Sequence, residues 1–187
     1  MQMSSFFSAL ALGSAALLAA HPAVAQQKLV PAQSEVQFTA RQMGVPLEGH
    51  FKKFDAQVSF DPAKLATSKI VFTVDTGSAT MGSRETDAEL PKATWFNVPQ
   101  FPQATFQSSA IKALGAGKFE VTGKLSIKGL ARDVVVPVTL VQNGATTMAT
   151  GALPLKRLAF KIGENEWADT SMVADEVQVK FKLALTG

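Results

Sequence analysis

The sequence predicts a mainly β protein of about eight or nine strands, joined up and down in antiparallel order, with one short helical insertion. Three observations indicate this fold class. Apolar and polar residues alternate with a period of two through most of the chain after residue 26, as in strands that bury one face. Short turn-forming stretches, such as Asn143-Gly144, separate these runs and leave no room for parallel crossovers. Beyond the N-terminal segment, helical character is concentrated in residues 83–91.

The first 25 residues have the pattern of a secretory signal peptide. An apolar run over residues 6–20 precedes the small-x-small sequence Ala23-Val24-Ala25, after which we expect cleavage. The run is shorter than the ~20 apolar residues that a membrane-spanning helix needs, so a membrane-spanning protein is not expected. The sequence therefore predicts a signal peptide over residues 1–25, a single domain over residues 26–187 and a periplasmic location.

The amino-acid composition argues against several kinds of catalytic, metal-binding and nucleic-acid-binding site. The absence of cysteine excludes disulfides, thiolate nucleophiles and thiolate metal sites. The net charge of +3 is spread along the polar strand faces, whereas nucleic-acid-binding proteins concentrate basic residues, so no nucleic acid is expected. After residue 25 the only histidine is His50, and neither a Gly-x-Ser-x-Gly elbow nor a glycine-rich phosphate loop is present. We therefore expect no catalytic residue, no metal and no cofactor.

Three strands are expected before the helical insertion, at residues 36–40, 54–60 and 70–74. A loop that contains Gly44 and Pro46 is expected between the first two strands. After the second, Asp61 and Pro62 predict one or two helical turns, because aspartate caps helices and proline suits the first helical position.

The helical insertion begins at Ser83, which can cap a helix whose first turn holds Glu85 and Asp87. Pro91 ends it. The apolar residues that follow, Trp95-Phe96 among them, have no regular period. We expect this irregular aromatic loop to cover one end of the fold.

Further strands are expected after the insertion, at residues 104–112, 118–127, 134–140, 148–155, 158–162 and 176–185. Turns are expected at residues 115–117 and 129–133, and Asn143-Gly144 predicts a tight hairpin. Pro137 lacks an N–H group, so it predicts a bulge or a locally unpaired edge within its strand.

The apolar strand faces must pack on a second sheet or close on themselves. A closed barrel of about eight strands can be filled by its own side chains or can hold one small ligand, and periodicity leaves both possibilities open. Abundant inward apolar surface, combined with so few catalytic residue types, favours the binding of an apolar molecule over catalysis.

Several motifs together resemble the YceI-like family of exported lipid-binding proteins, from about Leu29 to the end of the chain. They are Gly49-x-Phe51-x-x-Phe54, Arg84-x-x-Asp87-x-x-Leu90 before Trp95-Phe96, Phe101-Pro102-x-x-Thr105-Phe106, and Thr122-Gly123-x-Leu125-x-Ile127-x-Gly129. The resemblance implies an extended lipocalin-like fold, an eight-stranded antiparallel barrel. Its long pore would hold a polyisoprenoid, a quinone or quinone precursor, or another long-chain amphiphile. The family usually has histidine where this chain has Glu89, which puts the head-group preference in question.

The expected ligand-binding residues form two sets. The pore lining is expected from apolar residues on the strands and the C-terminal loop: Phe38, Phe54, Val58, Phe60, Phe72, Val74, Phe106, Val121, Leu125, Ile127, Phe160, Val179, Phe181 and Leu183. Plain core packing is the alternative for each of these. Arg84 and Asp87 are the candidates for the pore mouth, or else form a salt bridge that fixes the helix to the barrel rim. Trp95 and Phe96 are expected to plug or gate one end.

The leading hypothesis is a periplasmic carrier or store of an isoprenoid lipid that performs no chemistry. One alternative is an enzyme of lipid or quinone metabolism that uses a carboxylate at the mouth, Asp87 or Glu89. Another is a filled structural module with a role in a stress response. Transient contact with a membrane and homodimer formation both remain open.

Overall fold

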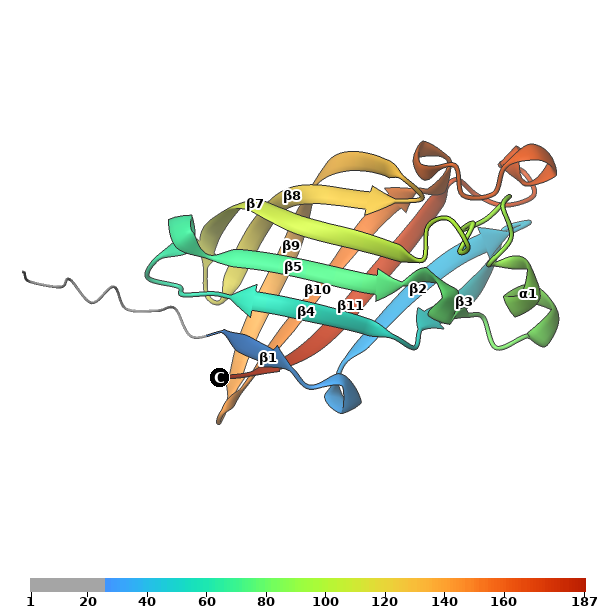
Figure 1. Ribbon diagram of the computed structural model, residues 1–187. Coiled ribbons are helices and arrows are strands. Elements are labelled where there is room, and N and C mark those ends of the chain that lie inside the picture. The colour runs from blue at the N-terminus through green and yellow to red at the C-terminus, as the bar shows by residue number, and fades with distance from the viewer. Residues whose placement is uncertain (1–25) are drawn as a thin grey trace, which may run out of the picture.

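The computed structural model describes residues 26–187, which form a closed antiparallel barrel elongated along one axis (Figure 1). The predicted signal peptide lies outside the described residues. The strands are β1 (Gln27–Leu29), β2 (Glu35–Gln42), β3 (Val45–Phe51), β4 (Phe54–Ser59), β5 (Lys69–Asp75), β6 (Ala79–Thr80), β7 (Gln103–Gly115), β8 (Lys118–Ile127), β9 (Leu130–Asn143), β10 (Thr146–Lys156) and β11 (Glu176–Thr186). The helical elements are α1 (Arg84–Glu89) and the 3-10 turns η1 (Pro31–Gln33), η2 (Leu65–Thr67), η3 (Thr76–Ser78), η4 (Arg157–Phe160) and η5 (Asn165–Ala168).

These segments make up eight barrel strands. Two strands, β1 and β2, pair with different parts of β11. On their other side, β1 pairs with β4 and β2 pairs with β3. Next in the sheet, β4 pairs with β5 and β3 pairs with β6. Each of these three barrel strands is therefore interrupted once. The sheet runs on through β7, β8, β9 and β10 to β11, and the pairing of β1 with β11 closes it. The predicted antiparallel, mainly β fold with one short helix is confirmed, as is closure into a barrel.

The expected loop around Gly44 and Pro46 is wrong, because this segment is the start of β3. Met43 and Gly44 alone make the turn, and both have positive φ, 48° and 81°, the backbone of a type I′ hairpin that matches the twist of antiparallel strands. Pro46 is tolerated because β3 pairs only with β2 at this point, and β6 reaches only His50 and Phe51.

Two further expectations after the insertion need correction. The turn expected over residues 129–133 is limited to Lys128 and Gly129, again with positive φ at both, and β9 starts at Leu130. The strand expected over residues 158–162 is instead the 3-10 turn η4, which ends at Lys161 in a left-handed conformation. A five-residue alternation is too short to separate a strand from one helical turn.

Pro137 lies where β9 loses one of its neighbours. The ladder between β9 and β10 ends at the pair of Val138 and Gly151, whereas the ladder between β8 and β9 continues past Pro137 to Leu130. The predicted locally unpaired edge is therefore present, and it coincides with the residue that has no N–H group to donate.

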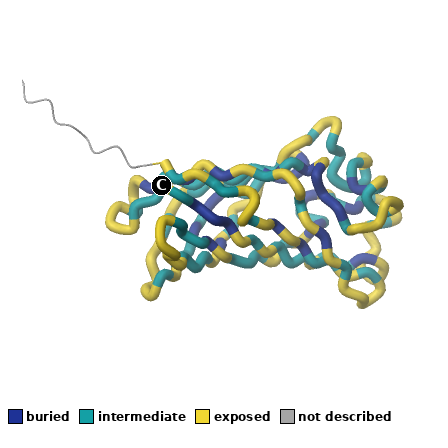
Figure 2. Tube along the Cα trace, turned by 90° about the horizontal axis from the view of Figure 1, so that it is seen from below, coloured by how far each residue is buried: buried dark blue, intermediate teal, exposed yellow. Residues whose placement is uncertain are grey.

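The barrel has two different ends, which lie opposite each other along its axis (Figure 1). We call the first the helical end: it consists of residues 84–101, with α1, and residues 157–175, with η4 and η5. The second, the hairpin end, consists of the β7–β8 turn, the β9–β10 turn and η2. Figure 2 shows that exposed residues gather in the turns at both ends, while buried positions recur along the strands between them.

The insertion closes the helical end by apolar packing. Leu90, 6% exposed, forms a buried cluster with Phe38 of β2 and Ala79 of β6. The rings of Phe51 and Phe96 meet edge to face with centroids 6.0 Å apart and extend this cluster. The aromatic loop thus covers one end of the barrel, as its irregular pattern predicts.

Candidate ligand-binding cavity

A cavity of about 770 Å³ runs through the barrel from one end to the other. At the hairpin end it is bounded by Gln27, Gly117 and Gln142, and at the helical end by Glu85 and Trp95. Between these ends its lining is almost entirely apolar. The volume lies within the ~300–1,000 Å³ typical of pockets for small ligands. The barrel interior is therefore a tunnel-like space and not a filled core.

Most of the residues predicted to bind a ligand face this cavity. The wall holds Phe38, Val58, Phe60, Phe72, Val74, Phe106, Val121, Leu125, Ile127, Val179, Phe181 and Leu183, and the helical end adds Trp95, Phe96 and Phe160. The strand residues were identifiable because a period of two puts alternate side chains on the inner face of a closed sheet.

Phe54 is not among the residues that line the cavity. It is the first residue of β4, directly after the break at Lys52 and Lys53, and its half-buried ring packs on that of Phe72 with centroids 6.0 Å apart. It also borders a separate shallow groove in the wall beside η1. Phe54 therefore supports a cavity-lining ring instead of lining the cavity itself.

Arg84 and Asp87, the residues predicted at the mouth, also lie outside the cavity lining. Asp87 accepts hydrogen bonds from the Thr80 hydroxyl and from the backbone N–H of Met81, which fastens α1 to the barrel rim. These bonds, that of Thr80 first, lower the pKa of Asp87. Among the described residues, Arg84 forms no ion pair with Asp87, so the hydrogen bonds of Asp87, and not a salt bridge, join the helix to the rim.

Asp87 and Glu89, the two carboxylates considered for an enzymatic mouth, both have partners within the protein. A general acid needs a raised pKa, whereas the hydrogen bonds to Asp87 lower its pKa. Glu89 does face the cavity from α1, but its carboxylate is paired with Lys92. Glu89, the position where the resemblance leads us to expect histidine, therefore borders the cavity with a carboxylate.

Glycines in the wall keep the cavity open by letting aromatic rings lie flat against the sheet. A Cβ atom on Gly49 would stand 2.3 Å from the ring of Phe38, and one on Gly151 would stand 2.4 Å from the ring of Phe181. Both glycines sit directly opposite these phenylalanines in the ladders. Gly123 makes the same room for Phe106. The motif glycines of β3 and β8 are thus explained by ring packing.

Arg157 is a cavity-lining residue that sequence reasoning missed. Its side chain is only 3% exposed and donates to four backbone carbonyls of the segments that follow, those of Ile162, Gly163, Val173 and Ala174. Burial lowers the pKa of Arg157, and the nearby charge of Asp175 opposes this shift. The guanidinium still keeps its charge at neutral pH. The one signal in the sequence was a charged residue directly after the apolar strand that ends at Lys156.

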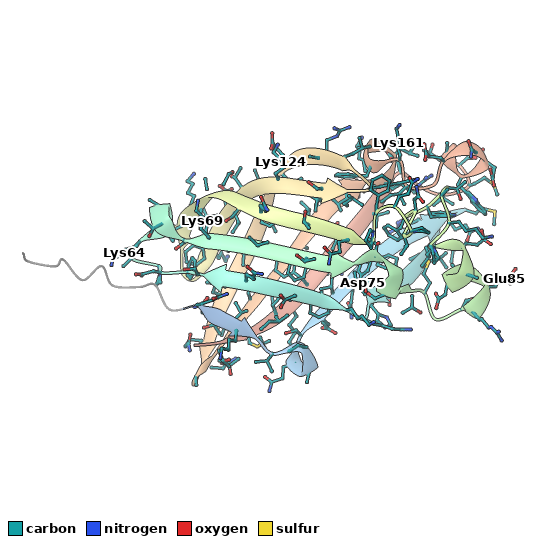
Figure 3. The ribbon with its side chains drawn as sticks, in the orientation of Figure 1. Lys64, Lys69, Asp75, Glu85, Lys124 and Lys161 are labelled. Carbon is teal, nitrogen blue, oxygen red and sulfur yellow. The ribbon has the colours of Figure 1, made fainter. Side chains whose placement is uncertain are left out.

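Lys128 fixes the same end from the neighbouring strand turn. It is 8% exposed, and its Nζ donates to the carbonyls of Ala93 and Lys161 at 2.7 and 2.6 Å and to Glu164 Oε2 at 2.9 Å. The hydrogen bond to Lys128 lowers the pKa of Glu164. Lys128 thus joins both loops of the helical end, residues 84–101 and 157–175, to the β8–β9 turn. Figure 3 labels Lys161 and Glu85, which lie at this end.

Within residues 26–187, no group of three or more histidine, aspartate or glutamate side chains is placed to hold a metal ion. In the same part of the chain, no helix has the length and apolar character needed to cross a membrane.

The chain is similar to a protein family, to other bacterial sequences and to solved structures. Residues 27–185 match the model of the YceI-like domain family. A UPF0312 protein of Azotobacter vinelandii is 36% identical over 140 residues, 73% of this chain and 72% of that protein. The crystal structure of Burkholderia cenocepacia BcnA is 51% identical, with a TM-score of 0.81 over 83% of this chain and 98% of that chain.

A more distant structure has the same fold. It is a polyisoprenoid binding domain from Saccharophagus degradans, implicated in plant cell wall breakdown, with a TM-score of 0.71 at 13% identity over 86% of this chain and 98% of that chain. The family match covers the strands of the barrel and the helical insertion, and the motifs that suggested it lie in both. This chain therefore belongs to the YceI-like domain family.

Proposed function

We propose that the protein binds one long-chain isoprenoid lipid in its barrel cavity and carries or stores it in the periplasm without catalysing a reaction. A polyprenyl chain, a quinone or a quinone precursor is the ligand class. The observation that carries the proposal is the continuous apolar cavity of about 770 Å³. The polyisoprenoid binding domain of the Saccharophagus structure, which has the same fold, supports the choice of ligand class.

Burial of hydrocarbon supplies the binding free energy. At about 0.8 kcal/mol for each buried CH₂ group, a five-carbon isoprene unit contributes about 4 kcal/mol. Association costs roughly 4–15 kcal/mol, so a chain of several units is needed for tight binding. Affinity should therefore rise with the number of isoprene units until the cavity is full.

The alternatives fit the structure less well. A filled structural module requires a packed interior, which the cavity contradicts. An enzyme that uses a mouth carboxylate requires a reactive group facing the ligand. Asp87 lies outside the cavity lining and both of its oxygens accept hydrogen bonds, and Glu89, which does face the cavity, is paired with Lys92.

The proposal is tested by native mass spectrometry of the protein purified from the periplasm, followed by organic extraction of any bound molecule. A single apolar passenger per chain is expected. Absence of such a passenger under several growth conditions, together with failure to take up added polyprenol, would refute the proposal. Recovery of the protein only from the cytoplasm would refute its periplasmic part.

A matched pair of variants on β10 tests whether the cavity is the site. Ala149→Phe adds a ring at a position that is 6% exposed and faces the cavity, whereas Thr150→Phe adds the same ring on the outer face. Ala149→Phe should reduce lipid affinity on the order of tenfold or more, because the added ring takes the space of at least two CH₂ groups, each worth about 0.8 kcal/mol. Thr150→Phe should leave affinity unchanged. Equal binding by both variants would place the lipid elsewhere.

A further inference from the structure

The cavity is apolar along its wall, but two hydrogen-bond donors border it at the helical end. The first is the indole N–H of Trp95. Its Nε1 atom is buried and has no acceptor within residues 26–187, although buried donors nearly always have one. An indole can donate but cannot accept. A partner for Trp95 must therefore bring an acceptor atom.

The second donor belongs to Arg157. A guanidinium has five N–H groups, and the four carbonyls around Arg157 take four of them. Nη2 has a single acceptor, the Val173 carbonyl at 2.6 Å, so one of its N–H groups is unused. In the part of the chain that the structure describes, no carboxylate lies within ion-pair distance of Arg157, and Asp175 acts on it only from farther away. Buried charges are normally paired, so this one favours a ligand with an electronegative oxygen.

Hydrogen bonds and ring contacts place the two donors in one cluster. The carbonyl of Thr94, next to Trp95, accepts from the backbone N–H of Gly163 at 2.8 Å, and the carbonyl of Gly163 accepts from Arg157 Nη1 at 3.0 Å. The ring of Trp95 packs on that of Trp167 with centroids 5.5 Å apart. All three side chains, those of Trp95, Arg157 and Trp167, line the cavity.

We propose that the helical end holds the head group of the lipid, with Trp95 Nε1 and Arg157 Nη2 as donors to an acceptor oxygen, and that the tail runs towards the hairpin end. The inference rests on the proposed function and adds an orientation and a head-group class. A quinone carbonyl meets the requirement, because it accepts and needs no acceptor in return. A pure hydrocarbon would leave both donors unpaired.

The hairpin end has the opposite character. Its buried polar atom without a partner among the described residues is Gln27 Oε1, an acceptor, so this end suits a hydroxyl donor such as that of a polyprenol. It lacks the two donors and the buried positive charge that the described residues place at the helical end. The helical end therefore suits a head group that accepts hydrogen bonds, and the hairpin end suits one that donates them. An experiment can distinguish these two orientations of the ligand.

The test compares two ligands with the same six isoprene units: ubiquinone with a six-unit tail, and the hydrocarbon squalene. Their competition for delipidated protein is measured by native mass spectrometry with three variants. Trp95→Phe removes the donor and keeps an aromatic ring. Trp167→Phe is the matched control in the same cluster, and Gln27→Leu removes the acceptor at the other end. Circular dichroism confirms that each variant is folded.

Trp95→Phe should weaken ubiquinone binding about three- to tenfold, the effect of one lost hydrogen bond, and leave squalene binding unchanged. Because Trp167 and Gln27 line the cavity, Trp167→Phe and Gln27→Leu should affect the binding of both ligands alike, and the preference between the two ligands should stay at its wild-type value. Equal effects of Trp95→Phe on both ligands, or a preference that shifts only with Gln27→Leu, would overturn the orientation while the proposed function stands. If wild-type protein binds neither ligand, the proposed function fails and the inference with it.

Discussion

The two ends of the barrel are closed in different ways. At the helical end, the buried side chains of Lys128 and Arg157 bind irregular loops through hydrogen bonds to backbone carbonyls. At the hairpin end, the sheet ends in the β7–β8 and β9–β10 turns, and none of the buried charged side chains of residues 26–187 lies there. One barrel can therefore have one end held by hydrogen bonds from buried charged side chains and another end made of strand turns. Hydrogen-bond donors for a ligand can then be concentrated at the first of these ends.

Of the substitutions that test this difference between the two ends, replacement of Arg157 should lower the free energy of unfolding the most. Arg157→Met leaves the buried carbonyls of four residues without their donor, so we expect a loss of about 3–5 kcal/mol in the free energy of unfolding. Urea denaturation followed by circular dichroism measures it. Lys112→Met, at an exposed position on β7, is the control and should stay within about 0.5 kcal/mol of wild type. Similar losses in both variants would show that Arg157 is not a special fastening point.

A pair of glycine substitutions compares the two ends directly. Gly163 and Gly144 both have positive φ, 78° and 60°, so alanine is strained at either position. A Cβ on Gly163 would also stand 2.3 Å from Arg157 Nη1, which its hydrogen bonds hold in place, whereas a Cβ on Gly144 would meet open space.

We expect Gly163→Ala to cost about 2–3 kcal/mol and Gly144→Ala about 1 kcal/mol, as measured by thermal or urea unfolding. A cost at Gly144 that equals or exceeds the cost at Gly163 would remove the distinction between the ends.

The smallest expected effect concerns the attachment of α1 at the helical end. Hydrogen bonds from Thr80 and then from Met81 lower the pKa of Asp87 below its ordinary value of 3.8. Because the folded pKa is the lower one, the contribution of Asp87 to stability is present above the unfolded pKa and is lost as the pH falls through the folded pKa.

The free energy of unfolding should therefore fall more steeply in wild type than in Asp87→Asn as the pH decreases from about 5 to about 3. Urea titrations at several pH values measure this slope. In a Thr80→Val background, the effect of Asp87→Asn on the slope should shrink, because the main hydrogen-bond donor to the carboxylate is gone. A slope that is the same with and without Asp87 would contradict the assignment.

Much of the barrel wall could be predicted from the chain alone. A period of two identifies the inward residues of β4, β5, β8 and β11, because alternate side chains in a strand lie on opposite faces whatever the surrounding fold. β3 was hidden because Gly44 and Pro46 are typical of loops, and only its pairing with β2 shows that they sit in a tight hairpin. Phe54 has the right period but follows a break in its strand, which sequence spacing does not reveal.

The helical end was the least predictable part of the site. Arg157 became a cavity residue only because the carbonyls of residues 162–163 and 173–174, from two separate parts of the following loop, turn towards it. No local pattern encodes that convergence. The role of Glu89 was flagged by the resemblance, and its side chain borders the cavity, but its pairing with Lys92 follows from the local geometry at the end of α1.

The sequence by itself determined the mainly β fold class, the inward faces of the regularly alternating strands, the hairpin near Asn143-Gly144 and the family, because each depends on local alternation, turn chemistry or motif spacing. Only the tertiary structure decided that the closed sheet leaves a space and that its helical end carries donors. Both depend on how side chains from distant segments fill or fail to fill a shared volume, which a linear pattern does not specify.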